Sequence, residues 1–250
     1  MASFSDYFSK QSGIYVKYRP TYPKELFSYL SSLTKEHNLA WDCGTGNGQS
    51  AIGLSEFYDS VIATDPSEEQ IKNAIANGKV IYRVEKAEDN SLQSNSVDII
   101  TIANALHWFN FDAFYKEVRR VLKSNGIIAA WAYALPIISP EIDSIAKQFH
   151  DDTLGTCWLP PNRMVEKGYT TIPFPFEQIV IPSFRIEKTM NLQDLIGYFN
   201  TWSATQRFIQ EKKFNPTEKL EKDIRKVWGN IELEKKLTWN LILKIGKVTQ

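Results

Sequence analysis

Residues 39–49 read Leu39-Ala40-Trp41-Asp42-Cys43-Gly44-Thr45-Gly46-Asn47-Gly48-Gln49, an apolar run followed by three alternate glycines. The first three residues predict a short buried strand, and the segment from Gln49 to Phe57 predicts the helix that follows. A strand that leads through glycines into a helix brings backbone N–H groups close to a ligand at the helix N-terminus. This stretch therefore predicts a ligand-binding loop in an α/β fold.

Helix and strand signals alternate through the first half of the chain. Pro23 opens an amphipathic helix, Ser67 caps a second helix that is expected to stop at Gly78, and a third is expected to stop at Asn125-Gly126. Further strands are predicted at 61–64, 80–84, 97–102 and 127–133. The alternation is typical of a parallel sheet with helices on both faces, and the β-branched, apolar run 97–102 is expected at its centre.

The pattern changes after residue 135. A helix begins at Ser139-Pro140, an irregular proline-rich stretch covers about 151–176, and a strand near 179–186 precedes two or three helices and a last strand at 239–245. We therefore predict a single domain, 1–250, divided into N-terminal cap helices (1–37), a cofactor-binding core (38–135) and a substrate-side elaboration with the last strands (136–250). The aromatic residues near the start suggest an apolar helix face: Phe4, Tyr7, Phe8 and Tyr15.

Composition limits the classes of partner. The 250 residues contain 29 Lys+Arg and 29 Asp+Glu, and this zero net charge argues against a broad phosphate-binding surface, so no nucleic-acid partner is expected. The N-terminus has no signal-peptide pattern, and no apolar stretch approaches the roughly 20 residues of a membrane helix. We expect a cytoplasmic protein without a membrane partner. Its oligomeric state, monomer or dimer, stays open.

Metal and disulfide chemistry are not expected. The two cysteines, Cys43 and Cys157, are too few for a disulfide framework or a cysteine metal site. The three histidines, His37, His107 and His150, are far apart in the sequence and form no zinc-ligand pattern. Aromatic residues make up 13% of the chain, which suits a pocket for a planar or apolar ligand as well as a core.

The acid that follows the glycine loop indicates the kind of ligand. Asp65 ends the next predicted strand, about twenty residues on, where a carboxylate can accept both hydroxyls of a ribose. NAD and S-adenosylmethionine both carry an adenosine, but the dinucleotide fingerprint needs Gly or Ala at position 49, where this chain has Gln49. Asp42, two residues before the first glycine, suits the ammonium group of a methionine better than a pyrophosphate. The spacing therefore favours S-adenosylmethionine.

With this D-x-G-x-G-x-G loop, the sequence resembles the class I methyltransferases that use S-adenosylmethionine. The segments Ala87-Glu88-Asp89 and Ser96-Val97-Asp98 are similar to the family segment that frames the adenine before the fourth strand. The resemblance implies a Rossmann-like three-layer sandwich with a seven-stranded, mostly parallel sheet and a reversed last strand. It also implies a set of cofactor-binding residues: Asp42, Gly44, Thr45, Gly46, Gly48, Asp65, Ala87, Glu88 and Asn104.

A narrower resemblance is to the trans-aconitate methyltransferase-like and plant embryonic-abundant-like proteins. It rests on residues 18–23 (Tyr-Arg-Pro-Thr-Tyr-Pro), 105–109 (Ala-Leu-His-Trp-Phe), 201–204 (Thr-Trp-Ser-Ala) and 239–241 (Trp-Asn-Leu). Arg19 and His107 are the catalytic candidates, the first as a carboxylate anchor and the second as a base or orienting group. Each has a structural alternative, a salt bridge for Arg19 and a packed histidine for His107. The substrate-binding candidates are Trp108, Trp131, Tyr133 and Trp202, with Trp158, Tyr169 and Arg207 as further pocket residues.

These residues together predict methyl transfer to a small molecule, with a carboxylic acid favoured. A carboxylate nucleophile needs orientation only, whereas a hydroxyl needs a base such as His107. Two other functions remain open: a non-catalytic module that binds S-adenosylmethionine and acts through a partner, and an NAD-dependent oxidoreductase. Residues 104–107, Asn-Ala-Leu-His, lack the prolines of the motif found in amino-methylating DNA enzymes that resemble this family.

Overall fold

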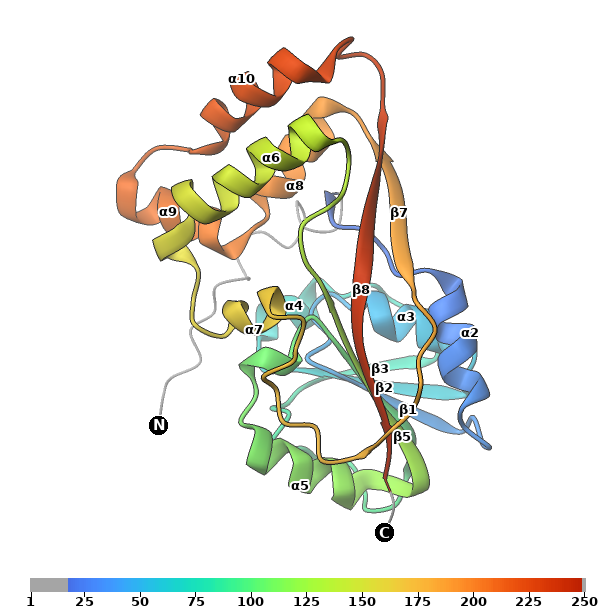
Figure 1. The fold of residues 1–250 in the computed structure, drawn as a ribbon. Coiled ribbons are helices and arrows are strands. Elements are labelled where there is room, and N and C mark those ends of the chain that lie inside the picture. Colours follow the sequence, from blue (N-terminus) through green and yellow to red (C-terminus); the bar gives the residue numbers. More distant parts are fainter. Residues whose placement is uncertain (1–17, 249–250) are drawn as a thin grey trace.

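A computed structural model describes residues 18–248, so the four aromatic residues noted near the start lie outside the described range. Within that range, eight strands form one mixed sheet in the order β3-β2-β1-β4-β5-β8-β6, and β7 pairs with β8 off this path. Figure 1 shows the sheet with helices on both faces and a further group of helices beyond one end of it. The architecture is the expected α/β fold.

The centre of the sheet consists of parallel strands: β1 (Leu39–Cys43), β2 (Ser60–Asp65), β3 (Val80–Val84), β4 (Val97–Ala103) and β5 (Leu122–Tyr133). β4 lies between β1 and β5, and its first six residues are buried. A strand covered on both faces has no solvent side, which is why this segment is almost wholly apolar. The expected central position of 97–102 is confirmed.

Successive residues of the central strands point to opposite faces of the sheet. Ile99 packs in a cluster with α2 (Lys24–Ser32) and α3 (Gln49–Ser55), whereas Ile100 packs in a cluster with α5 (Phe111–Val121). These two apolar layers hold the carboxyl ends of the strands, and therefore the glycine loop, in place.

Two predicted helix ends are wrong. α4 (Glu68–Lys72) stops well before Gly78, because the chain turns toward the glycine loop and the N–H of Ile75 donates to the Asn47 carbonyl at 3.1 Å. α5 ends at Val121, and β5 begins at the next residue. The pair Asn125-Gly126 therefore lies inside a strand, where Asn125 takes a left-handed φ of 64° and marks an irregularity rather than a helix stop.

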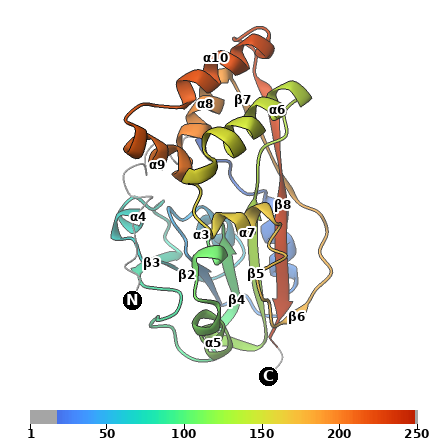
Figure 2. The same cartoon turned by 60° about the vertical axis from the view of Figure 1, so that its left-hand side comes forward.

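The second half of the chain builds a helical cap. It contains α6 (Pro140–Gln148), a π-helical turn (Phe149–Thr153), α7 (Asn162–Glu166), α8 (Leu192–Asn200), α9 (Ser203–Lys212) and α10 (Thr217–Trp228), with a 3₁₀ turn at Gly155–Cys157. Another 3₁₀ turn, Leu106–Trp108, follows β4 in the first half of the chain. α10 packs against α6 and α8 over a third apolar cluster. In Figure 2 these helices lie above the sheet, beyond the upper end of β5.

The last strand, β8 (Lys235–Lys247), runs antiparallel to β5, which confirms the reversed last strand. Its first half extends beyond β5 and pairs with β7 (Arg185–Met190), so the sheet has eight strands rather than seven. The strand predicted near 179–186 is displaced: β6 is only Glu177–Gln178, and β7 begins at Arg185. Pro182 has no N–H to donate to a ladder, which disfavours a strand between them. No helix within 18–248 has both the length and the apolar character needed to cross a membrane.

Candidate active site

The glycine loop follows β1 and is held by backbone hydrogen bonds. The N–H groups of Gly44 and Thr45 both donate to the carbonyl of Thr64 in β2, at 2.8 and 2.9 Å. Gly44, Gly46 and Gly48 all have positive φ, at 68°, 55° and 88°. Residues with a side chain rarely adopt this conformation, so the glycines let the chain turn tightly between β1 and α3.

The three glycines differ in what surrounds them. A Cβ on Gly44 would lie 2.6 Å from Ala105 Cβ, and one on Gly48 would lie 2.2 Å from the hydroxyl of Tyr82. A Cβ on Gly46 would meet nothing closer than Gln70 Oε1, at 3.9 Å. Gly44 and Gly48 thus permit close packing of the protein itself, whereas the loop at Gly46 has room for a ligand.

Asp65 lies beside this loop at the carboxyl end of β2. One carboxylate oxygen accepts the N–H of Gly46 at 2.9 Å, and the other accepts the N–H of Ser67 at 2.9 Å. The Ser67 hydroxyl in turn accepts the Gln70 N–H and caps α4, as predicted. The carboxylate is therefore held in one orientation at the edge of the loop.

Asp42 lies in β1, just before the glycine loop. Its side chain is completely buried, and it accepts hydrogen bonds from the hydroxyls of Thr45 at 2.5 Å and Thr101 at 2.7 Å. Burial raises the pKa of this carboxyl, and these hydrogen bonds oppose the rise in part. Asp42 thus ties the glycine loop to β4, and its place deep below the loop is that of a group that shapes the loop.

The two residues expected on the adenine side lie in the segment between β3 and β4. Ala87 is buried, and Glu88 is half-buried with one carboxylate oxygen accepting the N–H of Asn110 at 2.8 Å. Asn47, which sequence reasoning did not single out, is 4% exposed, and its side-chain nitrogen has no hydrogen-bond partner within the described part of the chain. A buried donor of this kind is costly unless something accepts its hydrogen bond.

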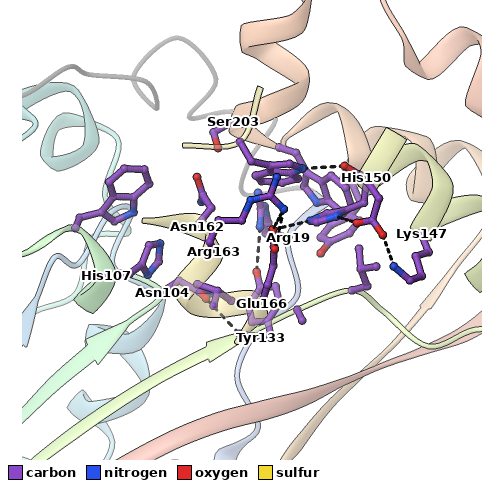
Figure 3. A pocket seen from close by; sticks show the side chains of 18 residues that line it. Arg19, Asn104, His107, Tyr133, Lys147, His150, Asn162, Arg163, Glu166 and Ser203 are labelled. Atoms are coloured by element: carbon purple, nitrogen blue, oxygen red, sulfur yellow. Dashed lines mark hydrogen bonds and ion pairs between the residues drawn. The ribbon is translucent and has the colours of Figure 1, made fainter. Parts of the chain in front are cut away.

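A cavity of about 650 Å³ opens beyond the carboxyl ends of β4 and β5, under the helical cap. Of the predicted site residues it brings together seven: Arg19, Asn104, His107, Trp108, Tyr133, Trp158 and Trp202. Figure 3 shows Asn104 and His107 toward one side of it, Lys147 and His150 toward the other, and Arg19 between them. The cavity thus joins residues that are more than 180 positions apart in the sequence.

Arg19 is held at the cavity wall by hydrogen bonds of its guanidinium. Its Nε donates to the hydroxyl of Thr201 at 2.9 Å, its Nη2 to the carbonyl of Thr201 at 3.2 Å, and its Nη1 to the hydroxyl of Tyr133 at 3.4 Å. The guanidinium also lies over the ring of Tyr198, 5.4 Å from the centroid. These contacts to oxygen acceptors and an aromatic face fix its direction.

Asn104 marks the end of β4 and has a strained backbone. Its φ is 54°, its Nδ2 donates to the Tyr22 hydroxyl at 3.1 Å, and its Oδ1 accepts the N–H of Tyr133 at 3.3 Å. A non-glycine residue in this region costs free energy and is typical of functional sites. Asn104 lies where the glycine-loop side of the sheet meets the cavity.

His107 follows in the 3₁₀ turn and is 6% exposed. Its Nδ1 lies 3.0 Å from the hydroxyl of Tyr169, and burial lowers its pKa to about 4. The imidazole is therefore neutral near pH 7, and it forms part of the cavity wall beside Trp108. Tyr169 itself supports His107 from behind and does not line the cavity.

The structure does not place every predicted residue in the cavity. Trp131 was expected there but is fully buried in the core, where it packs edge-on against Tyr22 and Phe27. Alternation along β5 could not have shown this, because Tyr133, which lines the cavity, has the same parity as Trp131. Tyr133 lies at the end of the strand, whereas Trp131 lies within it. Arg207 bonds to the carbonyl of Cys157 and is not among the lining residues.

Several lining residues were missed by sequence reasoning. Tyr198 belongs to an amphipathic helix, and others come from the end of α6, the π-helical turn and α7, where no local pattern predicts a site: Lys147, His150, Asp151, Asn162, Arg163 and Glu166. Thr201 lies in the segment 201–204, whose resemblance to the narrower family gives Thr201 itself no role. Its contact with Arg19 joins positions 182 residues apart, so no local signal could have revealed it.

Comparison with known proteins identifies the family. A methyltransferase domain family matches residues 41–130. A Dictyostelium discoideum protein described as a methyltransferase is 34% identical over 94% of this chain and 90% of its own. A solved structure from Anaeromyxobacter dehalogenans, described as a type II methyltransferase, superposes with a TM-score of 0.86 at 36% identity, covering 92% of this chain and 98% of that one. The chain belongs to the class I S-adenosylmethionine-dependent methyltransferases.

A Saccharomyces cerevisiae relative, named as an S-adenosylmethionine-dependent methyltransferase, is 28% identical over half of this methyltransferase and 46% of its own length. The methyltransferase family to which this chain belongs uses S-adenosylmethionine, so this is the cofactor, and the residues present fit it. The loop has space at Gly46, a directed carboxylate at Asp65, and at Asn47 a buried amide donor with no hydrogen-bond partner among residues 18–248. These groups offer a ribose and an amino acid the hydrogen bonds that they need.

Proposed function

We propose that this methyltransferase methylates a small carboxylic acid, giving a methyl ester, and that the acid lies in the cavity beside Arg19. The carrying observation is the guanidinium of Arg19, held in a fixed direction at the cavity wall by Thr201 and Tyr133. A guanidinium can bind a carboxylate through two parallel hydrogen bonds, which orients it as well as attracting it. The volume of about 650 Å³ is in the usual range for a small-molecule site.

The cofactor-binding roles follow from the positions around the glycine loop. S-adenosylmethionine supplies a methyl group that is already activated on a sulfonium. Asp65 is placed to accept ribose hydroxyls, and the loop at Gly46 admits the cofactor closely. Thr45 and Asp42 keep the loop in shape, and Asn104 lies where the cofactor side meets the cavity. Ala87 and Glu88 are the proposed adenine-side residues.

The protonation state of His107 favours an acid over an alcohol as the acceptor. A general base is most effective when its pKa is near the pH at which the enzyme works. Burial lowers the pKa of His107 to about 4. Such a group is a weak acceptor for the proton of an alcohol or a phenol. A carboxylate is already deprotonated and needs only orientation in a site that excludes water. We assign His107 to the wall that orients the acceptor and keeps water out.

The zero net charge of the chain also supports a small acceptor rather than a nucleic acid, because no excess of cations is available for a phosphate backbone. The residues that line the cavity beside His107 are largely aromatic, with Trp108 at one end and Trp202 in the cap.

The test is an assay of methyl ester formation over a panel of carboxylic acids, phenols and amines, with the Arg19→Lys variant. We expect esters from at least one acid, and a KM for that acid raised about 10- to 100-fold in the variant, because a directed hydrogen bond to a charged group is lost. Arg207→Lys is the matched control, since Arg207 does not line the cavity, and it should leave KM unchanged. Methylation of a phenol or an amine, with no acid converted, would overturn the proposal.

A further inference from the structure

We propose that the acceptor is a monocarboxylic acid with an aromatic ring, and that this ring lies against a wall formed by Trp158 and Trp202. The inference deepens the proposed function and rests on it. It concerns the body of the substrate, whereas Arg19 concerns only the carboxylate. It uses two features of the cavity that the methyl-transfer reaction itself does not need.

The first feature is the tryptophan wall. The rings of Trp158 and Trp202 are 5.5 Å apart at 54°, and both line the cavity. Trp158 also lies against the ring of His150, at 4.6 Å and 31°, and its Nε1 donates to the His150 carbonyl at 3.1 Å. Both rings are therefore held in place before any ligand arrives, which lowers the entropic cost of binding one.

The wall adjoins the anchor for the carboxylate. Thr201, which accepts the Arg19 Nε–H bond, directly precedes Trp202 in the chain. Tyr198, which lies beneath the guanidinium, packs edge-on against Trp202 at 5.8 Å. An acid held by Arg19 thus has the aromatic wall immediately beside it.

A flat ring gains more from this wall than a saturated one. Aromatic faces and edges attract each other through their charge distribution, in addition to the apolar area that any hydrocarbon buries. A saturated ring of equal size buries similar area but lacks this attraction. The difference in kcat/KM between an aromatic and a saturated acid therefore measures the attraction between the substrate ring and the tryptophan wall, because the contribution of apolar burial is nearly the same for both.

The second feature is the pairing of charges at the outer end of the cavity. Lys147 forms an ion pair with Asp151, and Arg163 forms one with Glu166 at 2.8 Å. The ring nitrogens of His150 face the same two acids, at 2.6 Å from Asp151 and 3.6 Å from Glu166. The two carboxylates offset the two cations, so this end offers little net attraction to a second carboxylate of a substrate.

Figure 3 shows Lys147 and His150 across the cavity from His107, with Arg19, Arg163 and Glu166 between them. A di- or tricarboxylic acid bound at Arg19 would extend a further anion toward these ion pairs, whose cations already have acidic partners, so the anion would lose hydration for little attraction in return. An acid with a single carboxylate beside Arg19 and an aromatic ring beside Trp158 and Trp202 fits both features of the cavity.

The experiment compares phenylpropanoic, cyclohexylpropanoic and propanetricarboxylic acids as substrates of the full chain, by methyl ester formation. We expect kcat/KM to be roughly two- to tenfold higher for the phenyl acid than for the cyclohexyl acid, and lowest for the tricarboxylic acid. In Trp158→Leu the phenyl preference should disappear, while Trp158→Phe should keep most of it. Phe208→Leu, which removes an aromatic ring from α9 outside the cavity, should keep all of it.

The outcomes separate this inference from the proposed function. A tricarboxylic acid converted as well as the phenyl acid, or a phenyl preference that survives in Trp158→Leu, overturns the inference and leaves carboxyl methylation standing. Ester formation from none of the acids overturns the proposed function, and the inference with it. The comparison of the three acids on the unaltered chain decides the matter even where Trp158→Leu fails to fold.

Discussion

The cofactor side and the substrate side of this methyltransferase are built in different ways. The cofactor side consists of two short contiguous segments, the loop from Gly44 to Gly48 and the turn from Asp65 to Ser67. Both are held in shape mainly by hydrogen bonds of their backbone N–H groups. The substrate cavity takes single side chains from distant segments, among them Arg19, Asn104 and Trp202. One region depends on local conformation, the other on how the cap packs over the sheet.

This difference teaches where substitutions can be tolerated. A glycine with positive φ and a close neighbour admits no side chain, whereas a cavity wall can exchange one side chain for another while the fold persists. The cofactor site is therefore expected to tolerate few substitutions, whereas substitutions in the cavity can change substrate specificity. The following predictions test that contrast, beginning with the largest effect.

Gly48→Ala should destabilise the protein most. Gly48 has a φ of 88°, and a Cβ there would lie 2.2 Å from the Tyr82 hydroxyl, so the variant combines backbone strain with overpacking. We expect the free energy of unfolding to fall by about 2–5 kcal/mol, measured by urea denaturation.

Gly46→Ala is the matched control. Its φ is also positive, at 55°, but the nearest atom to a Cβ is 3.9 Å away, so only the strain of about 1–2 kcal/mol remains. Its main effect should fall on cofactor affinity, measured by calorimetry with S-adenosylhomocysteine. Equal loss of stability in the two variants would contradict the distinction between a packing glycine and a ligand-facing glycine.

His107 should make stability depend on pH. Burial lowers its pKa from 6.5 to about 4 in the folded protein, so between these pH values the unfolded chain binds a proton that the folded protein does not. Stability is fully retained above pH 6.5 and falls as the pH drops toward 4, by about 3 kcal/mol from this group.

The measurement is the free energy of unfolding against pH for the wild type and for His107→Gln, which can keep a hydrogen bond to Tyr169. Carboxyl groups contribute equally to both proteins, so the difference between the curves isolates the histidine. Curves that stay parallel from pH 7 to 4 would show that His107 is not held neutral by burial.

Much of the cofactor side could be predicted because its signals are local. The glycine loop, Asp65 and the Ser67 cap each depend on residues within a few positions of one another, and the strands follow from apolar runs. The two helix ends that were wrong depend on tertiary contacts instead. α4 ends where the N–H of Ile75 donates to the carbonyl of Asn47. α5 ends where the chain enters β5 and pairs with β4.

The cavity was less predictable for the same reason. Arg19 and Trp202 were named through a family resemblance, but the acceptor that directs Arg19, Thr201, is 182 residues away in the sequence. The charged end, with His150 and Glu166, lies in a stretch that has no periodic pattern. Only the packing of the cap brings these residues to one cavity.

Asp65→Ala tests the cofactor side by binding. Losing the carboxylate removes a charged acceptor and leaves the N–H groups of Gly46 and Ser67 without it, so affinity for S-adenosylhomocysteine should fall about 10- to 100-fold in calorimetry. Asp59→Ala, an exposed acid just before β2, is the control and should bind normally. NAD should not bind either variant or the wild type. Unchanged affinity in Asp65→Ala would remove Asp65 from the cofactor site.

Trp131→Phe should have the smallest effect and marks the boundary between the two regions. Its indole N–H is buried without a hydrogen-bond partner in the described part of the chain, so removing it offsets part of the packing that the smaller ring loses. We expect a change in stability of about 1 kcal/mol or less. The KM for the acid should stay within about twofold, whereas the same substitution at Trp202, which lines the cavity, should raise it. A raised KM in Trp131→Phe would mean that the packing around Trp131 and the cavity are coupled. The distinction between a rigid framework and an adaptable cavity wall would then not hold at β5.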